Sequence, residues 1–270
     1  MRIAIVKLSA MGDIVHAMVA LQLIKAQRPD VLIDWVVEQN LAGILADNPD
    51  INQILTVNLK ALKQNKRQVF TQIRQLRLYA ENHYDYVIDA QGLLKSAIVA
   101  KLLGRHTIGF SKNSIREKFA ASLYSQTVDI DYAENVIWRN IKVLCEPLGV
   151  QVTKSDVMNK VPFLHYKSLS QQPPLVREKK NVALILGASR PNKVYPVERF
   201  IELAIALEKD LGAHCVLIWG NEQELAAALL DLFLNSSIES INSIQVISEQ
   251  EKGTLINQVT EKLTELTSGI

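Results

Sequence analysis

Short apolar runs rich in β-branched residues alternate with longer amphipathic stretches, and this rhythm constrains the fold more than any other feature of the sequence. RIAIVK is followed by a predicted helix from about Gly12 to Ala26 and then by VLIDWVV, and the pattern continues through YDYVIDA and HTIGF. A helical stretch, AENVIWRNIKVLCEPLG, ends at Pro147 and Gly149. Such alternation predicts parallel strands joined by right-handed helical crossovers, with about six strands before residue 150.

A second, shorter alternation follows a stretch without periodicity. Residues 161–180, VPFLHYKSLSQQPPLVREKK, carry three prolines and several charges, which is the composition of a connector. NVALILGAS then begins a strand, followed by a predicted helix from about Val197 to Leu211, the run HCVLIWG, a helix from Glu222 and a weaker strand around IQVIS. We therefore predict an α/β protein of two Rossmann-like, doubly wound domains, residues 1–160 and 181–270, joined by this linker. Open sheets of this type bind ligands at the C-terminal ends of their strands, so we expect the site in a cleft that the two domains face.

Composition and charge exclude several classes of protein. Among 270 residues, 48% are hydrophobic, which is enough for a buried core, and 30 basic residues against 28 acidic ones give a net charge of +2. That balance argues against a dedicated nucleic-acid binder, so any anionic partner must be met by a local patch. Apolar stretches are shorter than the roughly 20 residues that cross a bilayer, and we expect no export signal. Cys145 and Cys215 lie far apart in apolar surroundings, which favours buried, reduced thiols.

The stretch KLSAMGDIVHA places one carboxylate, Asp13, where the first predicted strand passes into the first helix. A carboxylate at a helix start is common because the helix dipole favours it, and this is the default interpretation of an isolated aspartate. Here Ser9 offers a capping oxygen nearby, which weakens that interpretation and favours an Asp13 side chain directed into the cleft. The turn contains only Gly12 and lacks G-x-G-x-x-G, so a dinucleotide site is not expected there.

Two further clusters follow strands of the second predicted domain. In GASRPNKVYP, small residues around Ser189 let backbone N–H groups approach a ligand, and Lys193 places a cation near a helix N-terminus. Taken alone, this is also an ordinary loop with basic side chains. In IWGNEQE, Glu222 follows the next strand, and a helix start explains this residue as well as ligand binding does.

Four motifs of this sequence occur together in one known family. They are KLSAMGDIVHA, DWVVE (Asp34 to Glu38), YDYVIDAQGLLKSA (Tyr84 to Ala97) and SRPNKVYP. The chain resembles the lipopolysaccharide heptosyltransferases from Met1 to about Glu224, and the first and third motifs are specific to the heptosyltransferase I subfamily. The resemblance implies a GT-B fold and transfer of L-glycero-D-manno-heptose from ADP-heptose to Kdo of Kdo-lipid A, with inversion and without a metal or other cofactor.

The resemblance also implies roles for individual residues. Asp13 matches the family's general base, which deprotonates the acceptor hydroxyl, and Lys193 matches the lysine that neutralises the departing diphosphate. Ser9 and Ser189 match hydroxyl positions near the base and the phosphates. Glu222 matches a carboxylate that contacts the donor hydroxyls. Basic positions of the first domain that contact the anionic acceptor are matched by Lys63, Lys66, Arg67, Arg116 and Arg139. For the first three of these, a solvated helix face explains the charge equally well.

The sequence departs from the family near its C-terminus. The D-T-G-x-x-H loop that grips the nucleotide in the family does not occur here, and only about three strand candidates follow residue 180. The second domain is therefore predicted to be incomplete, as in a fragment, a frameshifted product or a short form, which places ADP-heptose binding in question. A truncated, non-catalytic protein that binds Kdo-lipid A is the alternative function. A nicotinamide-dependent oxidoreductase fits the fold class but not the glycine pattern.

Location and partners follow from the same resemblance. It implies a cytoplasmic protein, peripheral on the inner face of the inner membrane, that binds ADP-heptose and Kdo-lipid A. We expect a monomer with no nucleic-acid partner.

Overall fold

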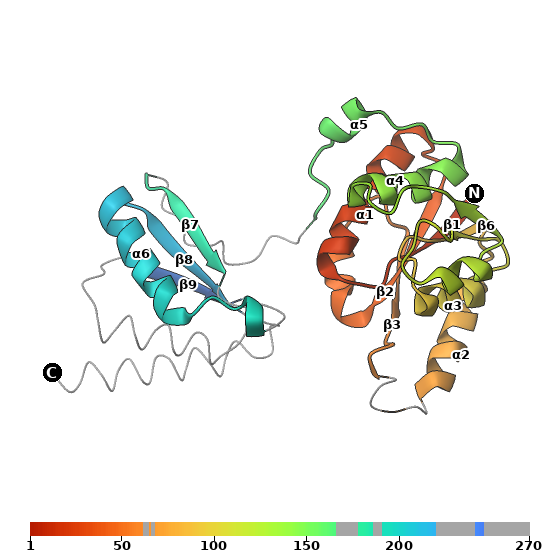
Figure 1. The fold of residues 1–270 in the computed structure, drawn as a ribbon, viewed down its shortest axis with the longest axis horizontal. Helices are drawn as coiled ribbons and strands as arrows, with labels where there is room; N and C mark the ends of the chain where they lie inside the picture. Colours follow the sequence, from red (N-terminus) through yellow and green to blue (C-terminus); the bar gives the residue numbers. More distant parts are fainter. Residues whose placement is uncertain (62–64, 66–67, 166–177, 186–190, 220–240, 246–270) are drawn as a thin grey trace. The chain divides into compact units, whose positions relative to one another are not determined.

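The chain divides into two compact units, Met1–Lys167 and Ser168–Ile270. The computed structural model describes residues 1–61, 65, 68–165, 178–185, 191–219 and 241–245. Each unit is an α/β body with its own parallel sheet (Figure 1). The predicted class, parallel sheets with helical crossovers, is confirmed in both.

The first unit is built on a six-stranded sheet in the order β3-β2-β1-β4-β5-β6, with every neighbouring pair parallel. Its strands are β1 (Arg2–Val6), β2 (Leu32–Glu38), β3 (Gln53–Val57), β4 (Tyr86–Asp89), β5 (Thr107–Phe110) and β6 (Gln126–Val128). The chain first adds strands on one side of β1 and then, from β4, on the other. This reversal makes the β1–β4 border the topological switch point, where doubly wound sheets open a crevice at the strand ends.

Helices cover both faces of this sheet (Figure 1). They are α1 (Met11–Gln27), α2 (Gln68–Ala80), α3 (Leu94–Leu103), α4 (Val136–Cys145) and the short α5 (Lys154–Met158). α1 and α4 pack together on one face, and α2 and α3 pack together on the other. Because both faces are covered, the central strands carry apolar residues on both sides, as Ile3, Ala4, Ile5 and Val6 of β1 do, instead of alternating strictly with polar residues.

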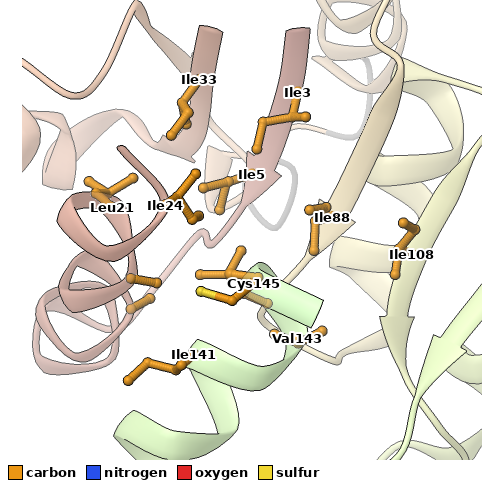
Figure 2. Packing of buried hydrophobic residues seen from close by; sticks show 14 of the residues in the cluster. Ile3, Ile5, Leu21, Ile24, Ile33, Ile88, Ile108, Ile141, Val143 and Cys145 are labelled. Carbon is orange, nitrogen blue, oxygen red and sulfur yellow. The ribbon is translucent and has the colours of Figure 1, made fainter. Parts of the chain in front are cut away.

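The core of the first unit follows the two-residue period of β1. Ile3 and Ile5 point toward α1 and α4, whereas Ala4 and Val6 point toward α2 and α3. On the face covered by α1 and α4, Ile88 and Ile108 of the sheet face Cys145 and the neighbouring residues of α4 (Figure 2). Cys145 is buried and free, as predicted, and burial raises the pKa of its thiol to about 12.

The described part of the second unit contains three parallel strands in the order β7-β8-β9. They are β7 (Asn181–Ile185), β8 (His214–Trp219) and β9 (Ile241–Gln245), and α6 (Val197–Leu211) joins the first two. α6 has the predicted bounds, and Gly212 ends it in a left-handed conformation, with φ of 58°. β9 begins before the predicted IQVIS segment. The predicted helix from Glu222 and everything after Gln245 lie outside the described residues.

Candidate active site

The loops that leave β1 and β4 meet at the topological switch point. The side-chain oxygen of Gln91, after β4, accepts hydrogen bonds from the backbone N–H groups of Leu8 (3.0 Å) and Ser9 (3.1 Å), after β1. Gln91 therefore fixes the turn that leads into α1 and that carries Asp13. A polar residue two positions after an apolar strand is the signal that could have indicated this role of Gln91 from the sequence.

Asp13 lies in the first turn of α1 and is half-buried. One of its oxygens, Oδ2, accepts the backbone N–H of Ala10 at 3.1 Å, whereas Oδ1 accepts no hydrogen bond from the described residues. Ala10 is the N-cap residue, and its side chain makes no cap hydrogen bond. The expectation that Ser9 supplies the cap is wrong, because the turn places Ser9 one residue too early. Asp13 thus does stabilise the helix start, yet only one of its oxygens is used for that purpose.

A buried lysine lies beside this carboxylate. Lys7 follows β1, and its Nζ donates to the carbonyl of Ala90 (2.7 Å) and to Oδ1 of Asn140 on α4 (3.3 Å). Burial lowers the pKa of the Lys7 ammonium, while the carboxylates of Asp13 and Asp89 raise it and Arg139 lowers it. The Lys7 ammonium is therefore buried close enough to the carboxylates of Asp13 and Asp89 for their charges to act on it.

Asp89, at the end of β4, shapes the loop that carries Gln91. It is fully buried and accepts hydrogen bonds from the Tyr124 hydroxyl (2.8 Å) and from the backbone N–H groups of Gln91 (2.8 Å) and Gly92 (3.2 Å). Burial raises the pKa of Asp89, and these hydrogen bonds oppose the rise. The carboxylate is enclosed by its own loop, so its role is to hold the loop in place.

Arg139 and Arg116 lie in different environments. Arg139 on α4 donates from Nη2 to the Ser114 carbonyl (2.6 Å), and its guanidinium lies over the rings of Phe110 (5.3 Å) and Tyr132 (4.6 Å). Its buried Nε has no partner among the described residues. The Arg116 side chain is 74% exposed, and it forms an ion pair with the neighbouring Glu117 carboxylate at 3.7 Å. Arg139 is thus held in place, whereas Arg116 is available to a ligand.

The remaining predicted residues lie elsewhere. Lys193 ends the short 3-10 helix Pro191–Lys193, between β7 and α6, and is exposed. Lys193 therefore lies after a strand and before a helix of the second unit, as the sequence predicted. Outside the described residues are Lys63, Lys66, Arg67, Ser189 and Glu222.

Comparison with known proteins decides the family. Residues 70–239, more than half of the chain, match the model of glycosyltransferase family 9 (heptosyltransferase). The chain belongs to this family. It is therefore a glycosyltransferase, and the resemblance inferred from its motifs is confirmed.

Relatives within the family match most of the chain. Lipopolysaccharide heptosyltransferase 1 of Campylobacter coli is 35% identical over 240 residues, which are 86% of this chain and 69% of that protein. The Escherichia coli K12 protein of the same name is 31% identical over 247 residues, covering 86% and 73%. The E. coli heptosyltransferase WaaC with ADP-2-deoxy-2-fluoro heptose is 24% identical with a TM-score of 0.73, covering 93% of this chain and 78% of that one. This likeness shows the GT-B type of fold.

The DWVVE motif of this glycosyltransferase divides between the two ends of the sheet. Glu38, at the C-terminal end of β2, is buried, and burial raises its pKa while the charges of Lys95 and Lys60 lower it. Asp34 is buried at the opposite end, where its carboxylate accepts hydrogen bonds from Arg2, Asn52, Asn82 and Tyr84. Only Glu38 therefore lies at the edge that carries Asp13.

The residues that the structure describes include no helix that is long and apolar enough to cross a bilayer. They also contain no group of three or more His, Cys, Asp or Glu side chains placed to hold a metal ion.

Proposed function

We propose that this glycosyltransferase transfers L-glycero-D-manno-heptose from ADP-heptose to Kdo of Kdo-lipid A, in the synthesis of the lipopolysaccharide inner core. The observation that carries the proposal is the Asp13 carboxylate at the switch point, with Oδ2 held by the Ala10 N–H and Oδ1 open. The relatives named lipopolysaccharide heptosyltransferase 1 and the neighbour with an ADP-heptose analogue support the choice of substrates.

The proposed reaction is a single displacement at the anomeric carbon of the heptose. The acceptor hydroxyl transfers its proton to Asp13 Oδ1 as its oxygen forms the new bond to that carbon. The bond from that carbon to the diphosphate oxygen breaks on the opposite face, so the configuration inverts. ADP leaves with the electron pair, and Lys193 stabilises its charge, which makes a metal unnecessary in this scheme.

Other predicted residues complete the proposed site. Ser9, Ser189 and Glu222 bind the donor, and the basic residues Lys63, Lys66, Arg67, Arg116 and Arg139 receive the anionic acceptor. Because this acceptor is a lipid, we place the enzyme in the cytoplasm, peripheral on the inner membrane. The alternative, a non-catalytic protein that binds Kdo-lipid A, shares the acceptor residues and differs only in lacking transfer.

A direct assay tests the proposed function. The purified protein is incubated with ADP-heptose and Kdo-lipid A in the presence of EDTA, and the product is analysed by mass spectrometry and by NMR of the anomeric proton. We expect one added heptose with inverted configuration. Acceptor binding without transfer would support the non-catalytic alternative, and transfer that requires added metal would contradict the role of Lys193.

Removing the Lys193 charge should slow transfer by about 10²-fold, the usual effect of losing one group that stabilises developing charge. Lys193→Ala should lower kcat in steady-state assays of ADP release. Lys209→Ala, an exposed lysine in the last turn of α6, is the matched control and should leave kcat unchanged. Equal rates for both variants would remove Lys193 from the reaction.

Loss of Arg116 should weaken acceptor binding with little change in kcat. Arg116→Ala removes an exposed cation without disturbing a packed contact, so the acceptor KM should rise by about fivefold to tenfold, and more at low salt. Arg139→Ala is a poorer test because it also removes the hydrogen bond to Ser114. The control is Arg105→Ala, an exposed arginine at the opposite edge of the sheet. An unchanged acceptor KM in Arg116→Ala would contradict its assignment.

A further inference from the structure

The outer surface of α2 and α3 combines exposed apolar and basic side chains. The two helices lie side by side over one face of the first sheet (Figure 1). Their outward positions, together with the adjacent 3-10 helix Lys118–Leu123, define what we call the α2–α3 face. Its apolar members are Phe70, Leu78, Leu94, Ile98 and Phe119, and its basic members are Arg74, Arg77, Lys95, Lys101 and Lys118.

The apolar members are unusually exposed for their size. Phe119 is 84% exposed and Phe70 is 78% exposed, although large apolar side chains in a folded unit are normally covered. Leu94 and Ile98 lie one helical turn apart on α3 and so share its outward side. The carboxylate of Glu117 accepts the backbone N–H of Leu94 at 2.8 Å, which holds the segment bearing Phe119 against the start of α3.

Charge separates this face from the opposite layer. α2 and α3 contain four basic residues, Arg74, Arg77, Lys95 and Lys101, and no acidic one. On the opposite layer, α1 and α4 contain three basic residues, Lys25, Arg139 and Lys142, and one acidic residue, Asp13. The helices of the α2–α3 face therefore carry the larger excess of positive charge.

We propose that the α2–α3 face docks on the surface of an anionic phospholipid bilayer. Basic side chains attract anionic headgroups, each contributing about 1 kcal/mol near the surface, and exposed aromatic and aliphatic side chains enter the headgroup region. An acidic protein partner would match the charge, but the exposed apolar side chains are distributed over α2, α3 and the 3-10 helix, which suits a fluid surface better than a shaped pocket. Docking by this face rests on the proposed function in one respect, since a lipid-linked acceptor brings the enzyme to a membrane.

Vesicle sedimentation with the full chain tests this proposal. We expect the protein to sediment with vesicles of phosphatidylcholine and phosphatidylglycerol, to bind pure phosphatidylcholine at least tenfold more weakly, and to be released by salt. The double variant Lys118→Gln/Phe119→Ser should bind the anionic vesicles about tenfold more weakly. Its matched control is Lys154→Gln/Met158→Ser on α5, which removes an exposed lysine and a 78% exposed methionine and should bind as the wild type does.

Several outcomes would overturn docking by this face. These are equal binding to both vesicle types, equal losses in the two double variants, or self-association in solution that depends on Phe119. Transfer to a delipidated Kdo acceptor should be unchanged in Lys118→Gln/Phe119→Ser, because neither residue belongs to the proposed site. Vesicle binding without any transfer would contradict the proposed function and leave docking intact, so the two can fail separately.

Discussion

The Asp13→Asn variant should fold normally and lose about 10²- to 10⁴-fold in kcat, the usual contribution of a general base. Asparagine retains a side-chain oxygen that can accept the Ala10 N–H, so the start of α1 is preserved. Its amide does not accept a proton at neutral pH. The acceptor KM should change little, because the lost interaction is made only in the transition state.

Kinetics and thermal unfolding together separate the two roles of Asp13. The Asp13→Ala variant loses the base and also the acceptor for the Ala10 N–H, so it should lose both kcat and some thermal stability. Asp13→Asn should lose kcat alone. If Asp13→Asn turns over at nearly the wild-type rate, the carboxylate serves only the helix start and the proposed mechanism is wrong.

The Asp34→Ala variant should lose about 3–5 kcal/mol in the free energy of unfolding, the range expected when one partner of a buried ion pair is removed. This carboxylate is fully buried and accepts hydrogen bonds from Arg2 (2.9 and 3.1 Å), Tyr84 (2.8 Å), Asn52 (2.8 Å) and Asn82 (3.2 Å). The substitution leaves all four donor side chains without this acceptor. Because they come from separate segments, the N-terminal edge of the sheet should loosen as a whole.

Urea unfolding followed by circular dichroism measures this loss. Asp30→Ala is a suitable control, because its ion pair with Arg28 is exposed to solvent and contributes little. Asp34→Asn is informative as well: its amide NH₂ group faces other donors, so it should recover only part of the stability. A midpoint for Asp34→Ala close to that of Asp30→Ala would contradict the central role of this carboxylate.

Asp34 and Asp13 lie at opposite edges of the same sheet, and we assign the first to stability and the second to catalysis. Asp34 lies at the N-terminal edge, where five hydrogen bonds use its carboxylate fully. Asp13 lies beyond the C-terminal edge, at the switch point, with one oxygen still open within the described chain. The sequence motifs include both residues, but they gave no role to Asp34.

Local sequence patterns predicted the fold class and several of the strands and helices in their observed order. Apolar runs of β-branched residues predicted the strands, and amphipathic periods predicted α1 within one residue at each end and α6 at its observed bounds. Four motifs also indicated the family, and the position of Asp13 after the first strand predicted its place beyond the C-terminal edge of the sheet. These inferences succeed because periodicity and turn chemistry act between residues a few positions apart.

The partners of the buried polar groups became clear only from the three-dimensional arrangement of the strands. The cap predicted at Ser9 is replaced by the Asp13 carboxylate, and the bond from Lys7 to Asn140 joins residues 133 positions apart. Gln91 holds the turn before α1 from 82 and 83 positions away, and Asp34 gathers donors up to 50 positions away. Such contacts form when strands far apart in sequence become neighbours in the sheet. No local pattern specifies which of several buried polar residues will then meet, because that depends on strand order and register.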